Sequence, residues 1–261
     1  MKIEVLRKKN RTITIVVLAI IVFAILCSEV VNFNIIKGAA SVPQAIKWLF
    51  SEFVPSRDSL SKLPDVINKL VETILLSIVA TTTAGIIALF FGVMGSKVTR
   101  INGVISTFSR LIASISRNVP DAVWAMVFLL SFGQNVLTGY FALFLVSFGV
   151  LTRAFIETMD ESSNEAVEAL EASGASKAQI VFQAIIPSSI SQMMSWILYM
   201  IETNIRSSTL IGILTGTGIG FMFEVYYKSM NYSVASLVVI AIIIAIIFIE
   251  FISNSVRRII L

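Results

Sequence analysis

Residues 233–253, SVASLVVIAIIIAIIFIEFIS, contain a single charged side chain, Glu250. An α-helix needs about 20 predominantly apolar residues to cross the hydrocarbon core of a bilayer, so this stretch predicts a transmembrane helix. Five further apolar runs are each bounded by charged residues, glycine or proline: Thr12–Phe33, Leu70–Met94, Val119–Phe132, Leu137–Ile156 and Ser188–Leu214. The sequence therefore predicts an all-α membrane protein with about six transmembrane helices.

The composition of the whole chain agrees with this prediction. Of its 261 residues, 56% are hydrophobic and 14% are charged, and the mean hydropathy is +0.90. A soluble domain is normally much less apolar, so we expect the lipid bilayer to surround the chain. The net charge of +4 does not indicate nucleic-acid binding, because Lys and Arg cluster at the ends of the apolar runs rather than on one polar face.

Several kinds of chemistry are excluded by the residue types that the sequence lacks. The chain has no histidine and one cysteine, Cys27, which lies in the first apolar run. Ser-His-Asp and Cys-His catalysis, histidine-ligated metal sites and an internal disulfide are therefore impossible. The GxxxxGK[ST] motif of ATP-binding loops is also missing. We expect no catalytic residue, no metal site and no cofactor in this chain.

The third apolar run, Val119–Phe132, is short for a transmembrane helix. Ile101–Ser116, immediately before it, is also largely apolar. Pro120 is expected to mark a kink where this approach helix becomes the membrane span.

We expect the chain to divide into two regions. Residues 1–66 hold the first transmembrane helix and an extracytoplasmic segment, in which residues 42–53 fit either a helix at the membrane interface or a structured loop. Residues 67–261 hold the other spans and a cytoplasmic loop at 160–187. Basic residues predict the orientation, because Lys and Arg are enriched in cytoplasmic flanks. With six spans, both termini are then cytoplasmic, on the side that carries Lys2, Arg7, Lys8, Lys9, Arg11, Lys97, Arg100, Arg110, Arg257 and Arg258.

The loop at 160–187, DESSNEAVEALEASGASKAQIVFQAIIP, has the pattern of two short helices joined by a turn. Asp160 and Glu161 are expected at the start of the first helix, where the positive end of the helix dipole favours acids. Gly174 lies where a left-handed residue would end that helix, and Pro187 marks the entry to the fifth span. Two capping-box patterns begin the helices: Ser162 with Glu165, and Ser176 with Gln179.

This loop resembles the cytoplasmic coupling loop of ABC importer permeases, whose pattern is Glu-Ala-Ala, three residues, Gly, nine residues and Ile-x-Leu-Pro. The matching positions here are Glu168, Ala169, Leu170, Gly174, Ala184, Ile186 and Pro187, of which Leu170, Ala184 and Ile186 depart conservatively. The resemblance implies a type I ABC importer permease fold. It also implies that Glu168–Ala178, including Ala175, docks into a cleft of a separate ATPase subunit, which binds the ATP.

Further motifs resemble the phosphonate-uptake branch of this family. They are Arg117-Asn118-Val119-Pro120-Asp121 ahead of Trp124-Ala125, Glu202-Thr203-Asn204-Ile205-Arg206, Leu210-Ile211-Gly212, and the glycines Gly216, Gly218 and Gly220. The glycine run departs from the Gly-Ala-Gly-Gly-x-Gly usual in that branch, and we expect it to make a turn and close helix contacts. The resemblance implies a homodimeric importer of phosphonate, phosphite or phosphate in a prokaryotic cytoplasmic membrane. Its partners would be an ATPase subunit dimer and an extracytoplasmic substrate-binding protein.

Polar residues within or beside the spans are the candidate pathway residues. Glu202, Asn204 and Arg206 lie inside the fifth apolar run, where a bare charge costs roughly 2.5–3.5 kcal/mol on insertion scales. Glu202 and Arg206 are four residues apart, so they either neutralise each other or leave Arg206 and Asn204 to border a translocation pathway. Arg117 and Asp121 have the same spacing and the same two alternatives, although snorkelling to the cytoplasmic interface is also expected there.

Other functions remain as alternatives. An ABC permease with this sequence could carry another small solute, such as an amino acid. An ion-coupled secondary transporter is expected to have intramembrane acids and two related halves, but Glu202 is the main acid deep in a span and no repeat is visible. An intramembrane enzyme would need paired aspartates or a Ser-Lys arrangement, and neither is evident in the spans.

Overall fold

The computed structural model of the chain describes residues 2–31, 33–100, 102–161 and 164–260. Throughout these ranges the regular secondary structure is helical. The chain forms two compact units, Met1–Phe53 and Val54–Leu261. The functional division at residues 66 and 67 stays a prediction.

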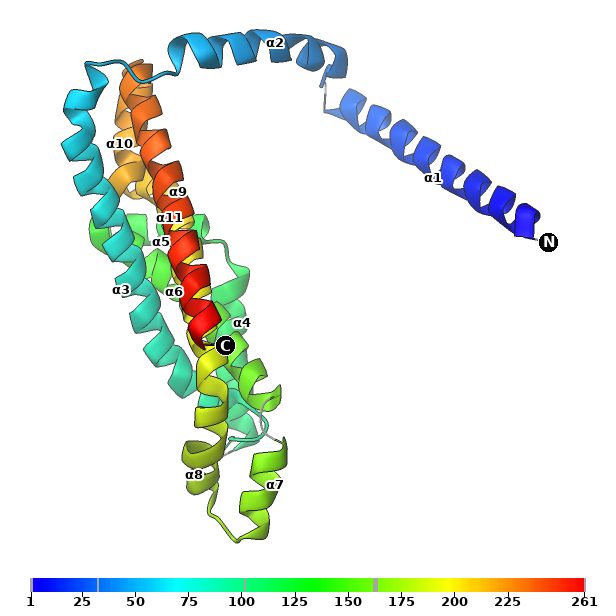
Figure 1. Ribbon diagram of the computed structural model, residues 1–261, viewed down its shortest axis with the longest axis vertical. Helices are drawn as coiled ribbons and strands as arrows, with labels where there is room; N and C mark the ends of the chain where they lie inside the picture. The colour runs from blue at the N-terminus through cyan, green and yellow to red at the C-terminus, as the bar shows by residue number, and fades with distance from the viewer. Residues whose placement is uncertain (1, 32, 101, 162–163, 261) are drawn as a thin grey trace. The chain divides into compact units, whose positions relative to one another are not determined.

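The first unit consists of two helices, α1 (Lys2–Val30) and α2 (Ile35–Glu52) (Figure 1). Lys9–Val30 is long and apolar enough to cross a membrane, which confirms the first predicted span. The side chain of Asn34 accepts a hydrogen bond from the backbone N–H of Lys37 at 2.9 Å and thereby caps the start of α2. Residues 42–53 are thus mostly helical.

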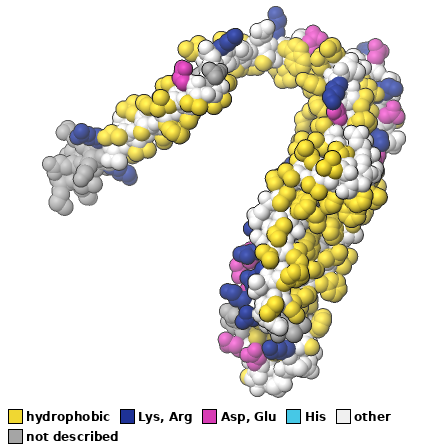
Figure 2. Space-filling view, turned by 180° about the vertical axis from the view of Figure 1, so that it is seen from behind, with side chains coloured by type: hydrophobic (Ala, Val, Ile, Leu, Met, Phe, Trp, Pro, Cys, Tyr) yellow, Lys and Arg dark blue, Asp and Glu magenta, His cyan; other side chains and the backbone are white. Residues whose placement is uncertain are grey.

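The second unit contains the rest of the described chain. Its helices are η1 (Ser59–Lys62), α3 (Leu63–Gly95), α4 (Gly103–Asn118), α5 (Asp121–Phe132), α6 (Val136–Glu161), α7 (Asn164–Ala172), α8 (Lys177–Ile180), the π-helical turn η2 (Val181–Ile185), α9 (Ile186–Thr215), α10 (Gly218–Lys228) and α11 (Tyr232–Ile260). The apolar core lies where α3, α6 and α9 meet, around the buried side chains of Leu151, Phe155 and Ile185. Figure 2 shows hydrophobic side chains over the middle of this unit and charged side chains toward its ends, as a bilayer requires.

In the described chain, five helices are long and apolar enough to cross a membrane, and they correspond to five of the six predicted spans. The third predicted span is different. α5 has 12 residues, or about 18 Å of helix, whereas the hydrocarbon core is about 30 Å thick. Val119 (φ −91°, ψ 124°) and Pro120 (φ −57°, ψ 146°) are extended and separate α5 from α4. Pro120 therefore breaks the helix where a kink was predicted.

Small residues let the helices of the second unit approach closely. A Cβ atom added at Gly149 in α6 would lie 2.6 Å from the backbone nitrogen of Arg117 at the end of α4. A Cβ atom at Gly220 in α10 would clash with the carbonyl oxygen of Thr209 in α9. Gly216 ends α9 in a left-handed conformation, with φ +68°. The predicted turn and close contacts of the glycine run are thus confirmed.

Candidate coupling loop and pathway residues

Helices α7 and α8 form the lower end of the second unit in Figure 1. α6 continues to Glu161 and α7 begins at Asn164. Asp160 and Glu161 therefore belong to the last turn of α6, and the prediction that they begin the first coupling helix is wrong. The apolar run of α6 simply continues as a helix beyond the predicted span. The predicted cap of α7 depends on Ser162, which lies outside the described residues.

The turn after α7 is a Schellman motif, in which a left-handed residue ends a helix. Gly174 has φ +80°, and its N–H donates to the carbonyl oxygen of Glu171 at 3.0 Å. The N–H of Ala175 donates to the carbonyl oxygen of Leu170, also at 3.0 Å. A Cβ atom at Gly174 would meet nothing within 4 Å, so the need for glycine is purely conformational. The predicted left-handed glycine is confirmed.

The second helix of the loop begins with the predicted capping box. The Ser176 hydroxyl oxygen accepts from the N–H of Gln179 at 3.4 Å, and the Gln179 amide oxygen accepts from the N–H of Ser176 at 2.8 Å. α8 then continues through η2 into α9, with Pro187 in the first turn of α9. A π turn widens the helix just before a proline ring that would otherwise press against the preceding turn.

The loop has an attached side and an open side. Val167 and Ile180 are buried in the apolar core, and Leu170 and Ala175 pack partly against the same core. Glu168 and Ala169 are exposed. Among the described residues, the carboxylate of Glu168 forms no ion pair. The loop thus presents an acidic side chain outward on a short structure that apolar contacts hold in place. Pro187 is exposed as well.

A group that we call the Glu202 triad joins α9 to α11, and consists of Glu202, Arg206 and Arg257. One carboxylate oxygen of Glu202 accepts from the Arg206 guanidinium at 2.8 Å, and the other accepts from the Arg257 guanidinium at 2.9 Å. Arg257 also donates to the hydroxyl of Ser253 at 2.8 Å. The predicted pairing of Glu202 with Arg206 is confirmed, and a second arginine shares the same carboxylate.

The triad carries two positive charges and one negative charge. The side chain of Glu202 is 10% exposed, whereas that of Arg206 is 45% exposed. The single carboxylate cannot neutralise both guanidinium groups, so the accessible Arg206 retains a net positive field around it. Sequence reasoning placed Arg257 only in a cytoplasmic flank. The available signal was its spacing from Ser253, which puts both polar side chains on one face of α11.

Asn204 lies in the interior of the second unit and is 2% exposed. Its amide nitrogen donates to the hydroxyl of Thr81 in α3 at 2.7 Å and to that of Ser147 in α6 at 2.6 Å. Both donors of the amide are therefore used to hold three helices together. This geometry supports a structural role for Asn204 within one copy of the chain.

Arg117 and Asp121 are not brought together as an ion pair in the described part of the chain. The extended residues between α4 and α5 interrupt the helix, so the spacing of four residues no longer puts the two side chains on one helical face. Arg117 is exposed at the end of α4. The carboxylate of Asp121 accepts from the N–H of Ala122 at the start of α5, at 2.8 Å.

Residues 86–261 match the model of a protein family described as binding-protein-dependent transport system inner membrane component. Over 191 residues the chain is 27% identical to the phosphate-import permease protein PhnE of Mycolicibacterium smegmatis, covering 73% of this chain and 36% of that protein. The chain thus spans about a third of the length of that relative. It is 26% identical to the phosphite transport system permease protein PtxC of Stutzerimonas stutzeri, over 74% of this chain and 70% of that protein. The chain is also 27% identical to HtxC of the same organism, over 98% of this chain and 88% of that protein. The name of HtxC likewise refers to phosphite transport.

Solved structures of transporters have a similar fold. The MetNI methionine ABC transporter, in an inward-facing conformation, matches with a TM-score of 0.67 and 20% identity over 79% of this chain and 99% of that chain. An amino acid ABC transporter crystallised with histidines matches with a TM-score of 0.66 and 16% identity over 76% of this chain and 95% of that chain. At these identities the likeness shows the fold alone.

Proposed function

The chain belongs to the family of binding-protein-dependent transport system inner membrane components, and we propose that it is the permease subunit of an ATP-driven importer of a small phosphorus oxyanion. The resemblance to ABC importer permeases of the phosphonate branch is confirmed by this family match and by the relatives named for phosphate and phosphite. The fold is that of type I importer permeases, and the protein is a multi-pass protein of the plasma membrane. As a permease subunit it is not an enzyme.

The geometry of α7, the turn and α8 is the observation that carries the proposal. A left-handed glycine and a capping box give the loop a defined shape, and one buried face attaches it to the membrane helices. The other face leaves Glu168 and Ala169 open to a partner. We propose that Glu168–Ala178 docks into a cleft of the ATPase, that Leu170 and Ala175 hold the turn against the core, and that Pro187 fixes where α9 begins. ATP is then bound by the partner alone.

Two copies of the chain form the pathway in this proposal, and each copy docks one of two ATPase subunits. Both termini and the coupling loop face the cytoplasm, and an extracytoplasmic binding protein delivers the substrate on the other side. Closure of the ATPases moves the coupling loops and switches the pathway from inward-facing to outward-facing by a rigid-body transition between two states.

The Glu202 triad supports an anion as the substrate. An anion that enters a region of low dielectric needs compensating charge or hydrogen-bond donors. Arg206 is half exposed and shares its carboxylate with Arg257, so its positive charge is available to a passing oxyanion. Arg117 and Asp121, four residues later, remain candidate pathway residues near the cytoplasmic end. Phosphonate, phosphite and phosphate share the oxyanion chemistry that this site would meet.

Uptake measured in the assembled transporter tests the proposed function. Liposomes would contain the chain with its cognate ATPase and binding protein, and radiolabelled phosphite and methylphosphonate would be supplied with ATP on the ATPase side. We expect ATP-dependent import of at least one of them. Sulfate serves as a matched oxyanion without phosphorus, and methionine as a zwitterionic solute. Import of methionine with neither phosphorus compound would contradict the substrate class and favour the amino-acid alternative.

The variant Arg206→Gln tests the pathway role separately. Arg257 still pairs with Glu202 in this variant, so the complex should assemble normally. If Arg206 borders the pathway, import of the phosphorus compound should slow at least tenfold. Normal import by a fully assembled Arg206→Gln complex would remove Arg206 from the pathway and leave the family assignment intact.

A further inference from the structure

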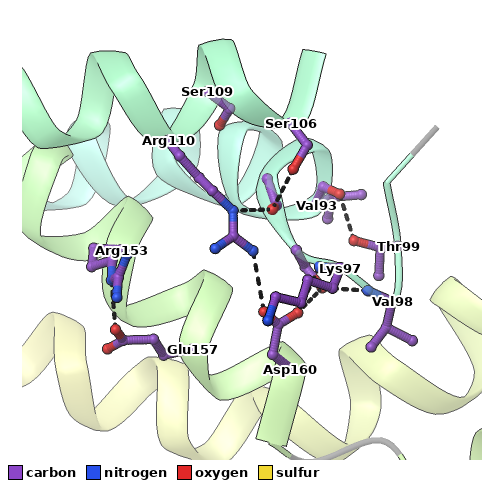
Figure 3. A network of polar contacts seen from close by, with 12 residues as sticks. Val93, Lys97, Val98, Thr99, Ser106, Ser109, Arg110, Arg153, Glu157 and Asp160 are labelled. Atoms are coloured by element: carbon purple, nitrogen blue, oxygen red, sulfur yellow. Dashed lines mark hydrogen bonds and ion pairs between the residues drawn. The ribbon is translucent and has the colours of Figure 1, made fainter. Parts of the chain in front are cut away.

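Asp160, next to last in α6, forms hydrogen bonds with groups just after α3 and in α4 (Figure 3). One oxygen of its carboxylate accepts from the hydroxyl of Ser96 at 2.6 Å and from the backbone N–H of Lys97 at 2.7 Å. The other oxygen accepts from the guanidinium of Arg110 in α4 at 3.2 Å. A single side chain thus connects the end of α6 to the end of α3 and to α4.

The same arginine ties α4 back to α3. The Arg110 Nε–H donates to the carbonyl oxygen of Gly95, the last residue of α3, at 2.8 Å, and the hydroxyl of Ser106 donates to the same oxygen at 2.8 Å. Carbonyl groups at a helix end lack partners within the helix, so these bonds satisfy a group that would otherwise be unpaired. Asp160 and Arg110 are largely shielded from solvent, with 22% and 29% of their side chains exposed. We call this set of residues the Asp160 joint.

The position of Asp160 is electrostatically unfavourable for its own helix. The C-terminal end of a helix carries partial negative charge, so an acid in the last turn of α6 is repelled by the helix that holds it. The donors that compensate the carboxylate come from Ser96, Lys97 and Arg110. Asp160 therefore stabilises the contact of α6 with α3 and α4, although it destabilises the isolated helix α6.

The Asp160 joint lies at the base of the coupling loop. Asp160 is one residue from the end of α6, and α7 begins at Asn164. α7 packs mainly on α8 and η2, which lead into α9. A displacement of the loop thus reaches α9 through one end of the loop, and it reaches α6 through the other end. At the end of α6 that leads into the loop, the Asp160 joint connects α6 through polar contacts to the end of α3 and to α4.

We propose that Asp160 is a positioning residue for coupling, which makes α4 and the C-terminal ends of α3 and α6 move as one body when the ATPase displaces the loop. This inference rests on the proposed function. Without the joint, the end of α6 can bend with the loop while α3 and α4 stay behind. ATP hydrolysis then continues, but fewer hydrolysis events lead to a change of the pathway. The joint would therefore set the number of ATP molecules used for each substrate molecule imported.

The test is the ratio of ATP hydrolysed to phosphite imported, measured in liposomes that contain the complete transporter. Asp160→Ala removes all three bonds, and we expect the ratio to rise at least threefold in complexes that contain the normal amount of ATPase. Asp160→Asn keeps an oxygen acceptor for Ser96 and Lys97 but loses the ionic contact with Arg110, so the ratio should rise less. A residue that only stabilises the fold would lower the yield of complex without changing this ratio.

The matched control lies one turn away in the same helix. Glu157 pairs with Arg153, also in α6, and both side chains are about half exposed (Figure 3). Because this pair connects no other helix, Glu157→Gln should leave the ratio at the wild-type value. An unchanged ratio in Asp160→Ala would overturn the proposal, as would a failure of Asp160→Asn to assemble, which would assign the joint to folding alone. If the wild-type complex imports neither phosphite nor methylphosphonate, the proposed function itself fails and takes this inference with it.

Discussion

The coupling loop and the Glu202 triad are the two polar features on which the proposed transporter depends, and they are built from contacts of different range. In the loop, the bonds that shape the turn join close neighbours, such as Ala175 to Leu170 and Gln179 to Ser176. In the triad, Arg257 and Glu202 are 55 residues apart in sequence and belong to different helices. A substitution in the loop can therefore remove coupling while the membrane helices stay folded. A substitution in the triad acts on the packing of α9 and α11 at once.

The largest loss of stability is expected when the shared carboxylate of Glu202 is removed. Glu202→Gln leaves the guanidinium groups of Arg206 and Arg257 close together with no negative charge between them. Breaking a buried ion pair by removing one partner costs about 3–5 kcal/mol, and solvent screening at the half-exposed Arg206 reduces this to about 2 kcal/mol. The thermal-unfolding midpoint of the purified complex should fall accordingly.

The arginine variants sharpen this prediction. Arg206→Gln or Arg257→Gln each leaves Glu202 with one partner, so each should change the free energy of unfolding by less than about 1 kcal/mol. An isolated Glu202–Arg206 pair, as the sequence indicated, would instead make Arg206→Gln as harmful as Glu202→Gln. If Arg206→Gln and Glu202→Gln lowered the free energy of unfolding equally, Arg257 would not share the carboxylate of Glu202.

A smaller change in stability, with a complete loss of coupling, is expected at the turn. Gly174→Leu puts a branched side chain in a left-handed conformation, which costs about 1–2 kcal/mol and unwinds the turn locally. Uptake and binding of the ATPase should both be lost, while the unfolding midpoint of the membrane helices changes little. Gly174→Asn should retain function, because Asn tolerates this conformation.

Gly133 provides the matched control for the turn. It also has a positive φ, +72°, and a Cβ atom there would meet nothing within 4 Å. It lies between α5 and α6, on the outer side in the proposed orientation. Gly133→Leu should thus strain the backbone but leave the ATPase bound. Loss of the ATPase in both variants would mean that general destabilisation, rather than docking, explains the effect of Gly174→Leu.

The smallest effect is expected from the capping box. Ser176→Ala removes the hydroxyl that accepts from the N–H of Gln179, and loss of such a cap costs about 1 kcal/mol. Hydrogen exchange of the backbone amides at 177–180 should become faster, and uptake should fall only modestly. In Ser173→Ala a hydroxyl that donates to the carbonyl of Leu170 is removed instead, and exchange at 177–180 should stay unchanged. Faster exchange in both variants would contradict a local role for the cap.

The features that could be predicted from sequence are those with local causes. Apolar runs predicted five of the spans, and turn-forming residues predicted the left-handed Gly174 and the Ser176 cap. Each of these features depends on residues that are close together in the chain. The pairing of Glu202 with Arg206 was predictable for the same reason, since both lie on one face of one helix.

The features that sequence reasoning missed depend on which helices lie together. The groups that bind Asp160 come from Ser96 and Lys97, just after α3, and from Arg110 in α4, and only the packing of these elements on α6 shows that an acid at the end of α6 has partners. Arg257 reaches Glu202 across the contact of α9 with α11. The spacing of Arg117 and Asp121 allowed an ion pair as one alternative, but the extended residues Val119 and Pro120 interrupt the helix between them.

Cross-linking from the coupling loop to the ATPase shows directly whether this loop docks the ATPase on the cytoplasmic side of the membrane. Single cysteines would be introduced by Ser173→Cys and by Ser229→Cys, an exposed position after α10, in a Cys27→Ser background. In native membranes, a short thiol-to-amine cross-linker should join the ATPase to the cysteine at 173 and not to the one at 229. In intact cells, an impermeant thiol reagent should label only the cysteine at 229. Labelling at 173 from outside, or cross-linking of the ATPase to 229, would contradict the proposed orientation and docking of the coupling loop.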